Sequence, residues 1–273
     1  MKLDSGFPRT VTVHGTGLIG CSFALALKET IPGVRIYGID NADILNRART
    51  IGAIEASGNA LPEASDLVIL STPVGDILQL TGELNPGNSL ILDVGSTKVD
   101  ICQRAEERGL PFVGGHPMTG SERSGPEAAS ADLFQGSRFF LCPISSTPAG
   151  AVSRLEAVIQ TMGAIPHVIS PENHDKLVAE LSHLPQILST VLADHTVEHR
   201  EFAGPGWKSV TRLAASPFHV WSDILMTSGS LPGELKTYIE RLNGILDALE
   251  RKDLKQLEAV FERANKSVFG GPH

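Results

Sequence analysis

The chain has 273 residues, of which 20% are charged and 41% hydrophobic, a composition typical of a soluble globular protein. This length favours two domains over one. The net charge of −8 argues against a nucleic acid or an anionic membrane as partner. Because no apolar run reaches the length of a membrane span and residues 1–8 lack a signal-peptide pattern, we expect a cytoplasmic protein.

The first motif in chain order is a glycine-rich turn between a predicted strand, residues 10–14, and a predicted helix, residues 21–29. It reads G-T-G-L-I-G. A strand before it and a helix after it are the context of a dinucleotide-binding fingerprint. The glycines permit a tight turn, close approach of a pyrophosphate, and close packing of helix on strand. With the pyrophosphate at the amino end of the helix, we predict cofactor contacts from Gly15, Gly17, Leu18, Ile19 and Gly20.

The next predicted strand, residues 34–39, ends in Asp40, twenty residues beyond Gly20. This is the expected distance for a carboxylate that binds the adenine ribose of the cofactor. A carboxylate there repels a 2′-phosphate, so the sequence favours NAD over NADP. The alternative is that Asp40 only caps the predicted helix over residues 42–51.

Strand and helix patterns go on alternating through the first half of the chain. Strands are predicted over 66–71, 89–93, 111–113, 137–143 and 165–169, and helices over 74–84, 98–108 and 149–162. This order indicates a doubly wound parallel sheet of the Rossmann type, with helices on both faces, over residues 1–170. The carboxyl ends of its strands line the cofactor crevice, so we expect 71–73 and 93–98 to face it, including Thr72, Pro73 and Ser96.

Residues 113–125 read V-G-G-H-P-M-T-G-S-E-R-S-G. This segment is rich in residues that form turns, and its apolar residues have no helical or strand spacing. We therefore expect this segment outside the core. Its ionisable centre is His116, a side chain suited to moving a proton at neutral pH. Because it follows a predicted strand of the sheet, His116 enters the same crevice, and we take this segment as the reaction site. The alternative is a surface loop with an incidental histidine.

Residues 171–273 have helical patterns only, which predicts a helical domain with helices over 172–200, 206–215, 217–227, 231–251 and 254–266. The apolar stripes of these helices suit a hydrophobic core or a subunit interface, and a homodimer is expected.

Two features of this helical region can carry chemistry. In S-H-L-P-Q, residues 182–186, a proline interrupts a helix, and polar groups can point into the crevice. Lys208 and Arg212 lie one turn apart and suit a carboxylate, or else form a solvated basic face.

No metal site is expected. The three cysteines, Cys21, Cys102 and Cys142, have unrelated spacings and are predicted to be buried free thiols. Residues 195–199 read H-T-V-E-H, a pattern seen in some zinc peptidases, but no further carboxylate ligand accompanies it. We favour a solvent-facing helix end for this segment.

Taken together, G-T-G-L-I-G, D-V-G-S-T-K at 93–98, G-G-H-P-M-T-G-S-E-R-S-G at 114–125, S-H-L-P and K-x-x-T-R resemble the prephenate and arogenate dehydrogenases of tyrosine biosynthesis. The resemblance covers nearly the whole chain in order, and its H-P-M-x-G-S-E block is quite specific. It implies a Rossmann domain, a helical dimerisation domain, and NAD-dependent oxidative decarboxylation of a cyclohexadienol. The products would be tyrosine from arogenate or 4-hydroxyphenylpyruvate from prephenate.

The resemblance also implies roles for single residues. His116 would be the catalytic imidazole, bonded to the ring hydroxyl of the substrate. Ser96 would orient this imidazole and touch the nicotinamide, and Arg212 would hold the ring carboxylate. The other implied members of the substrate pocket are Lys208, Ser121, Glu122 and His183.

One position departs from the family pattern. Family members that act on prephenate commonly have the sequence S-H-L-P-H in this segment, whereas this chain has Gln186 in place of the last histidine. A neutral amide cannot pair with the keto-acid carboxylate of prephenate as an imidazolium can, so Gln186 favours arogenate. Two other functions stay open: a β-hydroxyacid or imine-reducing dehydrogenase with a lysine proton donor, and a non-catalytic NAD(H) sensor.

Overall fold

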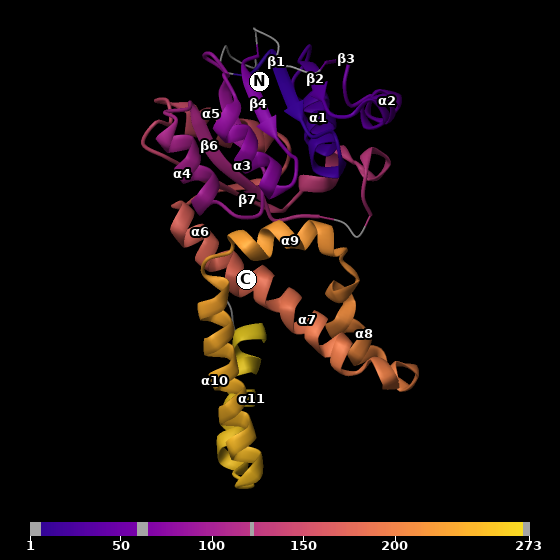
Figure 1. Cartoon of the computed structure of the whole chain (residues 1–273), viewed down its shortest axis with the longest axis vertical. Helices are drawn as coiled ribbons and strands as arrows, with labels where there is room; N and C mark the ends of the chain where they lie inside the picture. The colour runs from indigo at the N-terminus through magenta and orange to yellow at the C-terminus, as the bar shows by residue number, and fades with distance from the viewer. Residues whose placement is uncertain (1–6, 59–64, 121–122, 270–273) are drawn as a thin grey trace. The chain divides into compact units, whose positions relative to one another are not determined.

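The computed structural model describes residues 7–58, 65–120 and 123–269. Their backbone packing divides the chain into two compact units, Met1–Gly229 and Ser230–His273. In the first unit, eight strands form one sheet in the order β3-β2-β1-β4-β5-β6-β7-β8 (Figure 1). The strands are β1 (Thr10–His14), β2 (Arg35–Ile39), β3 (Ala56–Ser57), β4 (Leu67–Leu70), β5 (Leu90–Asp93), β6 (Phe112–Pro117), β7 (Arg138–Pro143) and β8 (Ile165–Val168).

The sheet confirms the predicted fold class, with one difference in strand direction. Strands β1 to β6 are parallel, and the strand order reverses between β1 and β4, the switch point at which doubly wound sheets bind ligands. Strand β7, however, runs antiparallel to β6, and β8 runs parallel to β7. In its described part, the link from β6 to β7 holds only the short 3-10 turns η1 (Pro126–Ala128) and η2 (Ala131–Phe134). It therefore shows no α-helical crossover of the kind that joins parallel strands.

Helices cover both faces of the sheet. On one face lie α1 (Leu18–Thr30), α2 (Ala42–Thr50) and α5 (Ala151–Thr161), and on the other α3 (Val74–Glu83) and α4 (Val99–Glu107). Because side chains alternate along a strand, Leu67 and Ile69 of β4 join the first core, and Val68 and Leu70 join the second. The unbroken apolar sequence of β4 is therefore explained by burial on both faces.

The remaining helices of the first unit follow β8. They are α6 (Pro171–Val178), a π-helical turn η3 (Ala179–His183), α7 (Leu184–His195), a 3-10 segment η4 (Val197–Phe202), α8 (Pro205–Thr211), a 3-10 turn η5 (Arg212–Ala215) and α9 (Phe218–Thr227). The predicted helix over 172–200 is confirmed from Pro171 to His195, and the interruption predicted at its proline is the π turn η3; only its end differs, since 197–202 form a 3-10 segment. Pro185 lacks an N–H to continue the hydrogen-bond ladder, and the wider π turn precedes it.

Helix α9 lies across the carboxyl ends of the strands (Figure 1). Its Asp223 accepts a hydrogen bond of 2.9 Å from the backbone N–H of Gly75, near the amino end of α3. Its Thr227 hydroxyl lies 2.8 Å from that of Thr97, which precedes α4. These two bonds fix α9 over the edge of the sheet where the sequence predicts the cofactor crevice.

The second unit consists of α10 (Leu231–Glu250) and α11 (Leu254–Phe269). Leu242, Leu246 and Leu249 of α10 are about half exposed within the chain. None of the described helices is long and apolar enough to cross a membrane. The predicted domain boundary after residue 170 stays a prediction, since the compact units divide after Gly229.

The expectation that residues 113–125 lie outside the core is wrong for its first part. Val113, Gly114, Gly115 and Pro117 are buried in β6, and His116 is only partly exposed. The glycines were interpreted as turn residues, but in β6 they allow close packing. A Cβ on Gly114 would lie 2.8 Å from the Cys102 sulfur.

Gly115 has the tighter surroundings of the two, and we expect Gly115→Ala to destabilise the protein by about 3 kcal/mol. The added Cβ would overlap the backbone carbonyl oxygen of Asp93 and lie 2.7 Å from Leu92 Cδ1. A backbone oxygen in a central strand cannot move aside cheaply. Urea unfolding measures the effect, with Gly120→Ala as control because nothing lies within 4 Å of a Cβ there. Equal unfolding midpoints for the two variants would contradict this packing.

Candidate active site

A cleft of about 490 Å³ lies between the carboxyl ends of β1, β4 and β5 and the start of α9. It is lined by residues from the glycine turn, from the loops after β4 and β5, and from 123–125. Six residues that the sequence predicts for the site are among them: Gly17, Leu18, Ile19, Thr72, Pro73 and Ser96. A larger cavity, about 690 Å³, lies at the amino ends of β4 and β5 and contains none of the predicted site residues.

The glycine turn has the geometry that a dinucleotide needs. Gly15 adopts a φ of 95°, and a Cβ there would lie 2.6 Å from the carbonyl carbon of Ser71. A Cβ on Gly17, in contrast, would meet nothing within 4 Å, so the backbone is open to a ligand there. No described side chain caps the amino end of α1, and the buried Thr72 hydroxyl has no hydrogen-bond partner among the described residues. These free polar groups suit a pyrophosphate.

Asp40 follows β2 and closes the glycine turn. Its Oδ2 accepts a hydrogen bond of 2.7 Å from Thr16 N, and its Oδ1 one of 2.8 Å from Asn41 N. The alternative that Asp40 caps α2 is wrong, because the cap is Asn41, whose side chain accepts from Ile44 N. The carboxylate thus lies beside the turn, and its ribose contact stays a prediction.

A buried ion pair lies next to the candidate site. Asp93 and Lys98 are both fully buried and paired with each other, so only residues 94–96 of the predicted 93–98 line the cleft. Asp93 also accepts hydrogen bonds from Gly95 N, at 2.8 Å, and Gly115 N, at 3.1 Å. Burial raises the pKa of Asp93, while the Lys98 charge and the two backbone bonds oppose this. The pair therefore joins the loop that carries Ser96 to the strand that carries His116.

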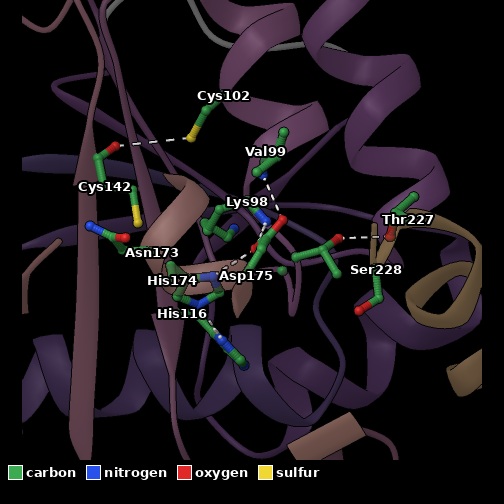
Figure 2. Close-up of polar contacts among 12 residues, drawn as sticks. Lys98, Val99, Cys102, His116, Cys142, Asn173, His174, Asp175, Thr227 and Ser228 are labelled. Carbon is green, nitrogen blue, oxygen red and sulfur yellow. Dashed lines mark hydrogen bonds and ion pairs between the residues drawn. The ribbon is translucent and has the colours of Figure 1, made fainter. Parts of the chain in front are cut away.

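His116 is the end of a hydrogen-bonded chain of three side chains, drawn in Figure 2. Its Nδ1 lies 2.9 Å from Nε2 of His174, whose Nδ1 lies 2.8 Å from Oδ1 of Asp175. Both His174 and Asp175 are buried in α6. The sequence analysis missed this pair. A signal existed, since His174 precedes Val178 by four residues and so shares its inward face.

Burial lowers the pKa of His116 well below its usual value. The electrostatic interactions with the neighbouring His174 and with Lys98 lower it further. Burial also lowers the pKa of His174, although the bond to Asp175 opposes it. His116 is therefore neutral at physiological pH, as a proton acceptor must be.

His183 and Gln186 lie in the interior with one unpaired atom each. His183 Nδ1 lies 2.8 Å from Ser228 Oγ, its ring makes a T-shaped contact with that of Trp221, and its Nε2 has no partner in the described part of the chain. Burial lowers the pKa of His183 to about 4. Gln186 Nε2 donates to the carbonyl oxygen of Leu213 at 2.9 Å, and its buried Oε1 is without a described partner. A carbonyl only accepts, so this bond fixes the orientation of the amide.

The other predicted residues are placed as follows. Lys208 in α8 and Arg212 at the start of η5 are exposed, and Ser121 and Glu122 lie outside the described residues. Ser96 lines the cleft, while the hydrogen bond that the structure shows for the His116 ring goes to His174. The roles of these residues stay predictions.

The cysteines are buried and free, as predicted. His195, Glu198 and His199 are exposed, and the two histidines lie on either side of the end of α7. Within the described ranges, no three histidine, cysteine or acidic side chains form a metal-binding group.

Comparison with known proteins agrees with this geometry. Residues 23–168 match the family model for the nucleotide-binding domain of prephenate dehydrogenase, and residues 170–263 match that for its dimerization domain. The chain is 34% identical to a prephenate dehydrogenase of Bacillus subtilis, over 96% of this chain and 76% of that protein. It is 28% identical to a cyclohexadienyl dehydrogenase of Zymomonas mobilis, over 94% of each.

Among solved structures, the Aquifex aeolicus prephenate dehydrogenase in complex with hydroxyphenyl propionate and NAD⁺ is similar, with a TM-score of 0.87 and 26% identity. The match covers 98% of this chain and 99% of that one. An arogenate dehydrogenase of Synechocystis shares the fold, with a TM-score of 0.80 at 23% identity over 94% and 98% of the two chains. This chain belongs to the prephenate dehydrogenase family.

Proposed function

We propose that this protein is an NAD-dependent dehydrogenase of tyrosine biosynthesis that oxidises and decarboxylates a cyclohexadienol acid. The observation that carries the proposal is His116, a neutral imidazole bonded through Nδ1 to His174 at the carboxyl edge of a dinucleotide-binding sheet. Its relatives include enzymes named for prephenate and for cyclohexadienyl substrates. The experiment that tests it is to supply NAD or NADP with prephenate or arogenate and to follow reduced nicotinamide. If none of the four mixtures formed reduced nicotinamide, the proposal would be contradicted.

His116 moves the proton in this reaction. Its Nε2 accepts the proton of the ring hydroxyl as the carbon–oxygen bond becomes a carbonyl. Bound NAD supplies the acceptor for the hydride that leaves the same carbon. The bond to the ring carboxylate then breaks, its electrons complete the aromatic ring, and His116 returns the proton to the oxygen. Ser96 and Arg212 position the substrate for these steps.

The residues present fit NAD. The open backbone at Gly17, the uncapped amino end of α1 and the unpaired Thr72 hydroxyl are suited to its pyrophosphate. Asp40, held beside the turn by Thr16, would accept hydrogen bonds from the adenine ribose and repel the 2′-phosphate of NADP.

The unpaired oxygen of Gln186 favours arogenate over prephenate. Since Nε2 is committed to Leu213, the free atom of the amide is an acceptor. A buried acceptor without a donor costs free energy, and the ammonium group on the side chain of arogenate is such a donor. The keto acid of prephenate offers acceptors only.

We expect Gln186→His to shift the ratio of kcat/KM for prephenate to that for arogenate about tenfold towards prephenate. A protonated imidazole pairs with the keto-acid carboxylate and repels an ammonium group. Steady-state kinetics with both substrates measures the ratio. Gln186→Asn, which shortens the side chain without adding charge, is the control. The same ratio in wild type and Gln186→His would remove the role assigned to this residue.

We also propose a homodimer assembled through residues 170–263. The family model for this region is described as a dimerization domain, and α10 exposes Leu242, Leu246 and Leu249. Exposed leucines at helical spacing are suited to a subunit interface. Light scattering after size-exclusion chromatography tests this assembly.

A further inference from the structure

We propose that His174 and Asp175 are positioning residues that hold His116 in the tautomer with its proton on Nδ1, which leaves Nε2 free to accept a proton. The tautomer itself follows from the contacts of the described residues. Its consequence for catalysis rests on the function proposed above.

The direction of each hydrogen bond follows from Asp175, the far end of the chain. A carboxylate only accepts, so the 2.8 Å contact requires a proton on Nδ1 of His174. In a neutral ring the other nitrogen, Nε2, is then an acceptor. The 2.9 Å contact between this Nε2 and Nδ1 of His116 therefore requires the proton on His116 Nδ1. The lone pair of His116 is left on Nε2.

The opposite tautomer of His116 is excluded by the same contact. It would place two lone pairs against each other at 2.9 Å, unless His174 carried protons on both nitrogens. His174 has no exposed surface, and its ring makes a T-shaped contact with that of Phe140, with the ring centres 5.3 Å apart. A second proton would put a charge in this buried site, beside the buried ammonium of Lys98.

Asp175 is itself held by the backbone at the start of α4. Its Oδ1 accepts from Lys98 N at 2.7 Å, and its Oδ2 accepts from Val99 N at 2.9 Å. These bonds fix the carboxylate on a rigid helix end, two residues beyond Ser96. The orientation of His116 is thus set by the same loop that carries the predicted serine.

This arrangement also suits the protonated form of His116. When Nε2 takes up a proton, the bond from Nδ1–H to His174 is kept and becomes charge-assisted. No side chain has to rotate, so the site is organised in advance for the charge that develops.

Two substitutions of His174 separate the two bonds of its ring. The amide of asparagine occupies the place of Nδ1, so His174→Asn keeps a donor to Asp175 and loses the contact with His116. The amide of glutamine reaches the place of Nε2, so His174→Gln retains an acceptor for His116. Both leave a buried polar side chain of similar polarity, which makes them a matched pair.

We expect His174→Asn to lower kcat about a hundredfold with KM within about twofold, and His174→Gln to recover about tenfold of this loss. If His174 acts through His116, the double variant with His116→Asn is no slower than His116→Asn alone. A purely structural role would instead lower the rate again in the double variant. Equal kcat in wild type and His174→Asn would also overturn the proposal.

The deciding readout is the ¹⁵N spectrum of histidine-labelled protein, which reports the protonated nitrogen of each ring. For wild type we expect His116 protonated on Nδ1, although free histidine favours Nε2. For His174→Asn we expect the proton on Nε2. A proton on Nε2 of His116 in wild type would overturn the inference, whether or not the variants fold. The spectrum needs no substrate, so this failure is distinct from a failure of the proposed function, which appears as absent turnover.

Discussion

Replacement of His116 by asparagine is expected to lower kcat about a thousandfold and to leave KM within about threefold. The asparagine amide takes the place of Nδ1 and keeps the bond to His174, but it has no atom at the place of Nε2. Binding and local packing are therefore retained while the proton acceptor is lost. Steady-state kinetics at saturating NAD measures both parameters.

The pH dependence of the rate is the control for this variant. Because burial holds the pKa of His116 well below its usual value, the neutral base persists as the pH falls. We expect wild-type kcat to stay constant as the pH falls through about 6.5, where an ordinary histidine titrates, and to fall only well below it, since protonation removes the acceptor. The kcat of His116→Asn should not show this decrease at low pH, because the variant has no imidazole to protonate. A raised KM with unchanged kcat would show that His116 only binds substrate.

Replacement of Lys98 by methionine is expected to destabilise the protein by about 4 kcal/mol. Methionine keeps the side chain apart from its terminal ammonium group, which leaves the Asp93 carboxylate without its countercharge, and both residues have no exposed surface. The two backbone bonds to Asp93, from Gly95 and Gly115, cannot replace an ammonium group. Urea unfolding at neutral pH measures the loss.

Two controls separate this charge effect from a loss of packing. The double variant Asp93→Asn, Lys98→Met removes both charges, keeps an amide oxygen for one backbone donor, and should recover about half of the lost stability. Lys28→Met breaks the partly exposed pair of Lys28 with Glu55, and we expect it to cost less than about 1 kcal/mol. If Lys98→Met costs no more than Lys28→Met, the buried pair does not hold the site together.

Local patterns were enough to predict most of the fold. The strands before and after the glycine turn, and the helices on both faces, follow from apolar runs and periodicity. The direction of β7 and the π turn before Leu184 were not predictable in this way, because they depend on tertiary contacts. The burial of Gly114 and Gly115 was missed for the same reason, since glycine has the same pattern in a turn and in a tightly packed strand.

Some of the predicted site residues belong to local motifs, and the structure places Gly17 of the glycine turn and Ser96 on one cleft. The roles of these residues and of His116 stay predictions.

The partners of His116 were not predicted. The spacing of His174 from Val178 was a weak signal, but a histidine and an aspartate near the start of a polar helix are more commonly exposed. Asp93 ends a predicted strand and Lys98 begins a predicted helix, and both were expected to face the crevice. Only the three-dimensional contacts show that both pairs are buried.

The measurement that tests the central claim most directly is the stoichiometry of one reaction with NAD and arogenate. Reduced nicotinamide, carbon dioxide and tyrosine are quantified in the same sample, with His116→Asn as the blank. We predict equal amounts of the three products, and the corresponding result with prephenate and 4-hydroxyphenylpyruvate if that acid is used. Reduced nicotinamide formed without carbon dioxide would contradict the account, because the protein would then be a dehydrogenase of another kind.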